Sequence, residues 1–503
     1  MFDRWHCQRF TNDNGTLLNS GGWCPFSRLT ANFCLFFAIH TVKMDLPQHR
    51  SRGNVGFSEQ TDAYLRRILM DRVYENDDVL FTKTFKPPKE GDNISSGLKA
   101  PQETFYKDDI PSLTEANRPF YTLLRALGCV PYSLNARGDV NANKLIVVYS
   151  IAFYSLIVYI VYQEVPARLN FSGLDTAVDN ARTLFSYAKV ALVPFIIWLP
   201  FRRVSKFFKA TFKFHSNYYR MTGEVIVLEW EKITPYIAVG IPVFSACIAL
   251  YSYLSLHHVI RMNILTGFLI WSTYTVTIGM DFMWCTPLMV LGKTAEVLIT
   301  TLKKKFATVE KDSAMQEYLV REYRALWLDL SKALQCNNDV STMTFTYHAL
   351  HVFLMLTMNL YGLLNGLRLP WSTDQNLRLI GTIVYLVELW LMANAAHYCT
   401  TKFEDIQWDP FFLIPSIDTP EAVRREMSTF LDVAVAAPHV VDIGGFVCIN
   451  RSWLTNMLGN LLSSLIILLQ FRVQQSDEPA VTTTTAGQVD NTTASTVAPS
   501  ASN

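Results

Sequence analysis

Charged side chains are scarce in this sequence. Asp, Glu, Lys and Arg make up 17% of its 503 residues, against about 25% in ordinary soluble domains. The formal net charge is only +1, so no global field points to nucleic acid as a partner. The charges also cluster, which leaves apolar runs of about 18 to 25 residues, the length that crosses a bilayer as a helix.

Secretory and enzymatic signatures are also lacking. The short apolar stretch 34–42 follows roughly thirty residues of chain and is too short to span a membrane, so it does not read as a secretory signal. Met44 is a possible alternative start. There is no phosphate-binding loop, no Gly-x-Ser-x-Gly and no His-Glu-x-x-His. The sequence therefore predicts neither an enzyme nor a cofactor.

Long apolar runs are what the sequence has instead, and they predict seven transmembrane helices. The second run is the weakest because Arg182 and Lys189 lie at its start. The fold class expected is an all-α membrane protein with spans at 145–162, 184–200, 236–256, 266–291, 342–363, 377–395 and 453–471.

Lys and Arg beside these spans indicate the orientation. Seven of them follow span two, eight follow span four and four follow span six, which makes nineteen on one side of the membrane. The loops on the opposite side and the end of span seven together hold six. Because cytosolic loops keep the excess of Lys and Arg, the N-terminus is predicted to be cytosolic and the C-terminus extracellular.

The cysteines and the C-terminal tail agree with this orientation. All nine cysteines fall in spans or in predicted cytosolic segments, so no extracellular disulfide is required. The tail after Phe471 is rich in Thr and Ser and contains the glycosylation sequon at Asn491, and a second sequon, at Asn170, lies in the first outer loop. Sequons at Asn14, Asn93 and Asn450 would face the cytosol and stay unmodified.

The predicted orientation is opposite to that of a G-protein-coupled receptor. Span three ends in Leu256-His257-His258, without an acidic–Arg–aromatic triplet, and the last span has no Asn-Pro-x-x-Tyr. A transporter would often show internal repeats with helices broken by Gly or Pro. No convincing repeat is visible, but a transporter or scramblase of inverted topology stays open.

Ionisable residues inside the spans are the candidate binding residues, because a buried charge in lipid is costly. Glu388, in the middle of span six, and Asp281, in span four, could pair with Lys189 or Arg182 of span two, or could line a hydrated pocket. A structural ion pair or a protonated acid is the alternative for Glu388. His348 and His351 of span five read first as packing groups, because no acidic or cysteine partner for a metal site is evident. His257 and His258, at the outer end of span three, read first as an interfacial polar pair, and sensing of acid–bicarbonate chemistry is the alternative.

The C-terminal third carries a family resemblance. Residues 463–471 read Ser-Ser-Leu-Ile-Ile-Leu-Leu-Gln-Phe, which resembles the insect gustatory receptor signature Thr-Tyr, five apolar residues, Gln-Phe, with Ser463-Ser464 in place of Thr-Tyr. Gly444-Gly445-Phe446 is similar to that family's entry into its last span. The stretches that look closest to the carbon dioxide receptor subgroup are 324–332, 360–363 and 396–398, and residues 118–121 are similar to the segment before the family's first span.

The resemblance implies an inverted seven-helix subunit of a ligand-gated cation channel that works without a G protein. It implies a tetramer around a central pore lined by the last helix, a ligand pocket in the outer half between spans two and six, and heteromers of related subunits. On this basis Glu388, Lys189 and Tyr385 are the candidate pocket residues. Carbon dioxide is the expected ligand, and a bitter or other tastant is the nearest rival.

Several copies of a Leu- and Ile-rich last helix meeting at an axis would make an apolar gate. The candidate pore residues are Ser464, Ile467, Leu468, Gln470 and Phe471, of which Gln470 and Ser464 are polar and uncharged. Helical spacing places Ser464, Ile467 or Leu468, and Phe471 on one face, and Ile466 on another. Close helix packing through the serines is the alternative.

The expected organisation combines these elements. Between the spans, apolar residues at helical spacing, such as Tyr323 and Leu326, predict cytosolic helices that would anchor the subunits together, and Pro420 predicts the start of another helix. The expected segments are a partly disordered cytosolic arm at 1–115, spans one to four in 116–292, an anchor segment at 293–341, spans five and six in 342–395, a second anchor segment at 396–452, the pore helix at 453–473 and an extracellular tail at 474–503.

Overall fold

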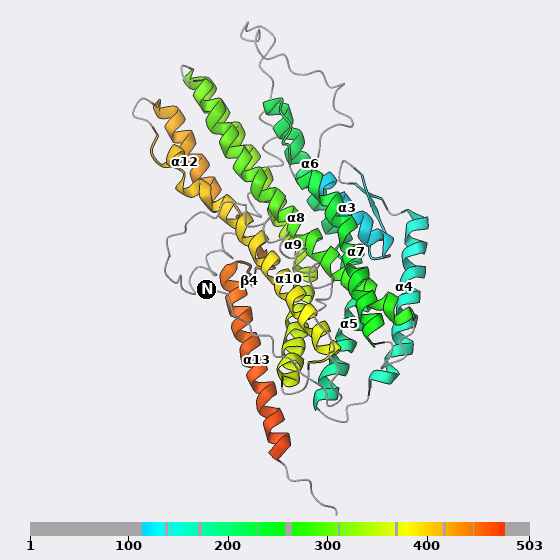
Figure 1. Cartoon of the computed structure of the whole chain (residues 1–503). Helices are drawn as coiled ribbons and strands as arrows, with labels where there is room; N and C mark the ends of the chain where they lie inside the picture. The colour runs from blue at the N-terminus through cyan, green and yellow to red at the C-terminus, as the bar shows by residue number, and fades with distance from the viewer. Residues whose placement is uncertain are drawn as a thin grey trace, which may run out of the picture. The chain divides into compact units, whose positions relative to one another are not determined.

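The computed structural model describes ten stretches of the chain: residues 113–135, 139–141, 143–169, 174–228, 230–256, 264–309, 312–367, 371–415, 419–445 and 447–477. Several predicted features lie outside these residues: most of the N-terminal arm, Asn170, the His257-His258 pair and Asn491. The described residues are almost entirely helical (Figure 1).

Within the described residues, seven helices are long and apolar enough to cross a membrane, which confirms the predicted number of spans. Short polar side chains begin several of them: Asn143, Asp312 and Ser372 each accept a hydrogen bond from a backbone N–H of the first helical turn. The seven helices are α4 (Lys144–Glu164), α5 (Leu174–Trp198), α7 (Trp230–Leu256), α8 (Ile264–Thr308), α9 (Ser313–Gly366), α10 (Thr373–Glu404) and α13 (Arg451–Asp477).

The second span begins earlier than its hydropathy suggests. Helix α5 starts at Leu174, ten residues before the predicted start at Leu184. Arg182 and Lys189 therefore lie inside the helix rather than at its beginning. Lys189 is fully buried there, so its placement depends on partners from other helices.

Helices α8 and α9 run well beyond their predicted spans. Helix α8 has 45 residues and α9 has 54, and only the few residues around 309–312 separate them. The predicted anchor segment 293–341 is therefore built as a continuation of two membrane helices and not as separate helices.

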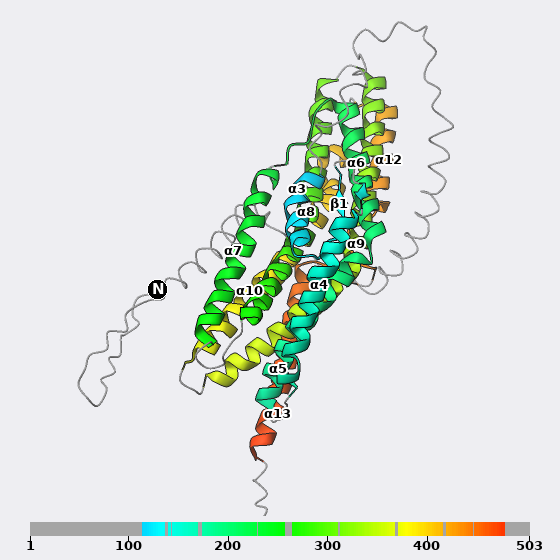
Figure 2. The ribbon, with the colours of Figure 1, turned by 90° about the vertical axis from the view of Figure 1, so that its right-hand side faces the viewer.

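The extended ends of α8, α9 and α10 pack with shorter helices into a second helical layer, visible at the upper end of Figure 2. These are α6 (Phe201–Thr222), η3 (Asp405–Trp408), α11 (Pro410–Leu413) and α12 (Glu421–Ala436). Trp327 of α9 is completely buried, and its ring centroid lies 5.2 Å from that of Phe403 and 6.2 Å from that of Phe430. The predicted apolar stripe on α9 is buried here, with Tyr323, Leu326 and Leu330 at most 3% exposed.

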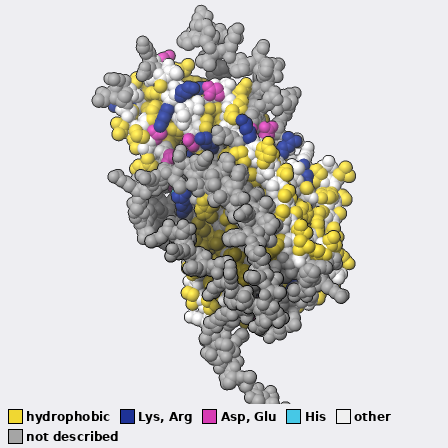
Figure 3. Space-filling model, in the orientation of Figure 1, with side chains coloured by type: hydrophobic (Ala, Val, Ile, Leu, Met, Phe, Trp, Pro, Cys, Tyr) yellow, Lys and Arg dark blue, Asp and Glu magenta, His cyan; other side chains and the backbone are white. Residues whose placement is uncertain are grey.

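Apolar side chains cover the outside of the other end. Leu145 and Tyr162 of α4 and Tyr236 and Val239 of α7 are all more than half exposed. On the face shown in Figure 3, charged side chains gather at the upper end, and uncharged apolar surface covers the lower right. This separation is the one expected of a protein whose lower part lies in lipid.

The remaining elements close the ends of the bundle. Helix α3 (Leu113–Ala126) packs against α7 and α8. The short strands β1 (Ser133–Leu134) and β2 (Val140–Asn141), and β3 (Asp442–Ile443) and β4 (Val447–Cys448), form two antiparallel pairs, and η2 (Pro166–Arg168) follows α4. Gly444 and Gly445 turn the chain between β3 and β4 with φ of 59° and 77°, a backbone region that favours glycine.

Candidate functional site

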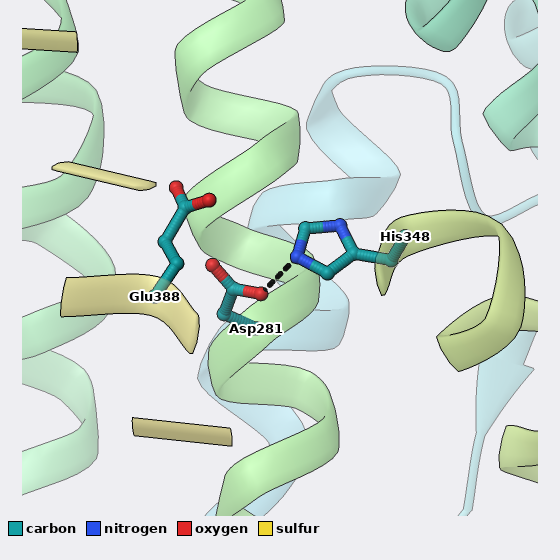
Figure 4. Close-up of side chains that lie close together, drawn as sticks. All are labelled: Asp281, His348 and Glu388. Carbon is teal, nitrogen blue, oxygen red and sulfur yellow. Dashed lines mark ion pairs between the residues drawn. The ribbon is translucent and has the colours of Figure 1, made fainter. Parts of the chain in front are cut away.

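Four ionisable side chains from four helices meet in the middle of the bundle. Lys189 of α5, Asp281 of α8, His348 of α9 and Glu388 of α10 are each at most 3% exposed. The Lys189 Nζ lies 3.0 Å from His348 Nδ1, and His348 Nε2 pairs with Asp281 Oδ1. Figure 4 shows the Glu388 carboxylate on the other side of Asp281. We call these four residues the buried cluster.

The buried cluster holds more acidic than basic groups. When Lys189 donates a hydrogen bond to His348 Nδ1, the ring is neutral and carries its proton on Nε2, the nitrogen that lies against Asp281. One ammonium then faces two carboxylates, a net charge of −1 within the bundle. Because an uncompensated buried charge is expensive, Asp281 and Glu388 are placed to receive protons from a neighbour.

Three of these residues also have the composition of a metal site. Asp281, His348 and Glu388 each offer a ligand atom, and these atoms lie within 4.8 Å of one another. His348 Nε2, however, faces Asp281 as a donor, and the Lys189 ammonium lies behind the ring. A cation would have to displace that proton beside a positive charge, so the donor set fits a proton better than a metal ion.

A cavity leads to the buried cluster from the side of α3 and α6. Asp281 and His348 form its polar end, and aromatic side chains such as Tyr121, Trp284 and Phe345 line its walls. The rings of Trp284 and Phe345 pack against each other with centroids 4.4 Å apart and planes tilted by 37°. A mostly apolar cavity with a few convergent polar groups is the usual form of a small-molecule site.

A second group of charges holds the other ends of α5, α9 and α10 together. Arg378 pairs with Asp179 and Asp374, while Arg182 lies 3.8 Å from Asp374 and donates to Asn359. We call these residues the charged clamp. Lys189 follows Arg182 by two turns, so the clamp lies on the order of 10 Å along the helix axis from the buried cluster.

The structure brings the three predicted pocket residues close together. Lys189 and Glu388 belong to the buried cluster, and Tyr385, 2% exposed, lies one turn before Glu388 with its ring centroid 6.1 Å from that of His351. Their role in ligand binding stays a prediction.

Two pairings inferred from the sequence are different in the structure. Arg182 joins the charged clamp and not Asp281 or Glu388. The sequence showed no acidic partner for His348, whereas Asp281 contacts it directly. The only sequence signal for this contact is that both residues are ionisable groups inside predicted spans; their separation along the chain hides the pairing.

Helix α13, which carries the predicted pore residues, makes few contacts within the chain. Leu461 and Leu465 are buried against the bundle, while Gln470 is exposed and Ile467 and Phe471 are 52% and 56% exposed. Ser464 and Leu468 are half-buried. Ile466, expected on a different face, is 56% exposed, so the uncovered apolar face is wider than predicted.

Comparisons with known proteins agree with this architecture. The 7tm chemosensory receptor family matches residues 118–475. The chain is 22% identical over 392 residues to gustatory and odorant receptor 24 of Anopheles gambiae, covering 76% of this chain and 84% of the relative. It is also 22% identical over 428 residues to gustatory and odorant receptor 21a of Drosophila melanogaster, covering 80% and 91%.

Solved structures show the same fold at lower sequence identity. The olfactory receptor OR5 of Machilis hrabei, solved in complex with eugenol, superposes with a TM-score of 0.54 at 12% identity, covering 71% of this chain and 98% of that one. A second structure of the same receptor superposes with a TM-score of 0.54 at 14% identity, covering 70% of this chain and 97% of that one.

The fold and its match over most of the chain define a multi-pass membrane receptor and not an enzyme. The chain belongs to the 7tm chemosensory receptor family, as the resemblance to insect gustatory receptors predicted.

Proposed function

We propose that the chain is a subunit of a ligand-gated, non-selective cation channel in the plasma membrane of sensory neurons, with a cytosolic N-terminus and an extracellular C-terminus. The uncovered face of α13 is the observation that carries this proposal. Ile466, Ile467 and Phe471 lie on a helix that buries little against its own chain. Four such helices around an axis would cover these side chains and form an apolar gate.

The proposed gate includes all five residues identified from the sequence. Ile467, Gln470 and Phe471 lie on the exposed arc of α13 and would face the axis or the next subunit. Ser464 and Leu468 flank that arc. Ser464 satisfies its hydroxyl by donating to Asn460 O at 2.9 Å, so it is free of any need for an intersubunit hydrogen bond.

Carbon dioxide is the proposed stimulus, with related subunits as partners in a heteromer. Support comes from the stretches 324–332 and 396–398, which resemble the carbon dioxide receptor subgroup. The buried cluster adds a chemical argument, because a buried amine beside proton acceptors can react with a small apolar electrophile. Glu388, Lys189 and Tyr385 form the proposed ligand pocket.

An organic tastant is the second candidate, favoured by the cavity itself. Its aromatic walls, including Tyr121, Trp284 and Phe345, offer far more apolar contact than carbon dioxide needs. A tastant would then occupy the cavity and meet Asp281 and His348 at its polar end.

Whole-cell current distinguishes these proposals. The chain is expressed alone and with its nearest paralogues, and carbon dioxide is stepped at clamped pH. A current that appears on co-expression and changes with Gln470→Ala supports the heteromeric carbon dioxide channel. Surface-expressed protein that ignores carbon dioxide but responds to tastants keeps the channel and replaces the ligand. Coupled flux without unitary current steps would instead indicate a transporter.

A further inference from the structure

Lys189 has an unusual environment for a lysine. Its side chain is fully buried, and its Nζ contacts the ring nitrogen Nδ1 of His348. Within the described part of the chain, no direct ion pair joins it to a carboxylate, although ligand atoms of Asp281 and Glu388 lie within 4.8 Å of His348. By contrast, Lys209 and Lys213 are ion-paired at the surface and about 60% exposed.

The surroundings of Lys189 resemble those of an activated nucleophile, which contacts a base that is itself oriented by an acid. The amine lies within hydrogen-bond distance of a base, His348, and the other nitrogen of that base is oriented by Asp281. A nucleophile, a base and an acid that orients the base form the arrangement in which a side chain attacks an electrophilic carbon. Histidine can accept a proton at Nδ1 while it passes the Nε2 proton to Asp281.

We propose that Lys189 is the site at which carbon dioxide binds, as a reversible carbamate on Nζ. This inference rests on the proposed function. The Lys189 ammonium first loses one proton, which passes through His348 to Asp281 and frees the Nζ lone pair. That lone pair forms a new N–C bond with carbon dioxide while one C–O π pair moves onto oxygen, and the nitrogen then loses its second proton to Glu388. No oxidant, reductant or further reactant is needed.

The reaction leaves the buried charge unchanged. Before it, the Lys189 ammonium and the carboxylates of Asp281 and Glu388 sum to −1. After it, a carbamate of charge −1 stands beside two neutral carboxylic acids. Moving net charge into or out of a bundle core is expensive. The site therefore favours a form of carbon dioxide uptake that leaves its net charge unchanged.

Carbamate formation would change the packing where four helices meet. The tetrahedral ammonium of Lys189, a hydrogen-bond donor, becomes a planar carbamate with two acceptor oxygens. These oxygens can accept hydrogen bonds from the protonated Asp281 and Glu388. The hydrogen bond from Nζ to His348 is lost at the same time. Since α5, α8, α9 and α10 each supply one member of the buried cluster, the change acts on the contacts between all four.

Chemical trapping tests the carbamate directly. Membranes holding the full chain with its co-expressed partner subunits are equilibrated with carbon-13 dioxide and treated with a trialkyloxonium salt, which converts a carbamate into a stable ester. Mass spectrometry then examines the Lys189 peptide, with the Lys209 peptide as the exposed control. The expected result is an isotope-labelled ester on Lys189, lost when carbon dioxide is removed before trapping, and none on Lys209.

The trapping result and the current answer separate questions. An absent label on Lys189, with the peptide detected, overturns the carbamate even if carbon dioxide opens the channel. A label without any carbon dioxide current keeps the carbamate and removes the proposed function. Lys189→Met adds a second test: a surface-expressed variant that keeps the full carbon dioxide response contradicts the inference. Loss of that response in Lys189→Met, with the response retained in the surface variant Lys209→Met, supports it.

Discussion

Arg378 and Asp179 lie 199 residues apart in the chain, yet the Nη2 atom of Arg378 is 2.7 Å from each carboxylate oxygen of Asp179. The same guanidinium donates to Asp374 through Nε at 2.6 Å. Arg378 is therefore the residue through which α10 is held to α5 at the charged clamp.

Arg378→Ala is expected to loosen this clamp. The substitution leaves two carboxylates side by side without their shared cation, and we expect a loss of about 2 kcal/mol in the free energy of unfolding. Thermal unfolding of the detergent-solubilised chain measures it. Arg425→Ala is the matched control, because Arg425 pairs with Glu421 on the surface of α12 with both side chains at least 80% exposed. Equal melting temperatures for the two variants would contradict the clamp.

Gly292 of α8 lies close to the backbone of α10. A Cβ added there would lie 2.9 Å from Tyr398 Cε1 and 3.1 Å from the Cα of Cys399. Because the second contact is to backbone, Gly292→Ala is expected to destabilise the protein by about 1–3 kcal/mol despite the better helix propensity of Ala. Gly267→Ala, whose nearest contact would be 3.8 Å, is the control and should be neutral or stabilising. If the melting temperature of Gly292→Ala equals that of the wild type, α10 shifts away from α8 without cost and the prediction is wrong.

The sequence predicts the number of spans and the packing face of the anchor helix, because both depend on local patterns. Tyr323 and Leu326 are buried as their helical spacing indicates. The start of α5 was missed for a physical reason. Asp179 and Arg182 lower the hydropathy of its first turns, but their charges are matched by residues of α10 that lie far away in the sequence.

The buried cluster was predictable only in part. Glu388 and Lys189 were identified because charges inside spans require a partner. The sequence allows a direct pairing between them, whereas in the structure Lys189 contacts His348, 159 residues away, and His348 contacts Asp281. No spacing rule connects residues on four helices whose packing depends on the whole fold.

His215 predicts how stability depends on pH. This side chain of α6 is 3% exposed, and burial lowers its pKa to about 4. In the unfolded chain it titrates near about 6.5. The folded state keeps it neutral, so the full stabilisation is present above pH 6.5 and is lost as pH falls from 6.5 towards 4. At pH 5 the loss should reach about 2 kcal/mol. Melting curves at pH 7.5 and 5.0 should therefore differ less for His215→Gln than for the wild type, and identical differences would contradict the assignment.

Glycosylation tests the proposed orientation. With the C-terminus outside, Thr493→Ala and Ser172→Ala each remove a sequon from an extracellular segment, and each should increase gel mobility by one glycan. Ser452→Ala removes the sequon at Asn450 without touching the Asn450 side chain, which accepts a hydrogen bond from the Trp453 N–H. Its mobility should equal that of the wild type. A shift for Ser452→Ala alone would reverse the orientation.

Helix α13 provides the test of the conduction path. Ile467 of α13 and Val243 of α7 are 52% and 59% exposed in the single chain, and both are β-branched and apolar. If four α13 helices form an apolar gate, Ile467→Thr makes the constriction easier to hydrate, and the current without stimulus should rise several-fold. Val243→Thr places the same hydroxyl on a surface proposed to face lipid, where a threonine can donate to its own helix backbone, so its basal current should stay at the wild-type level. A rise for Val243→Thr and none for Ile467→Thr, at equal surface expression, would assign the pore to a different helix.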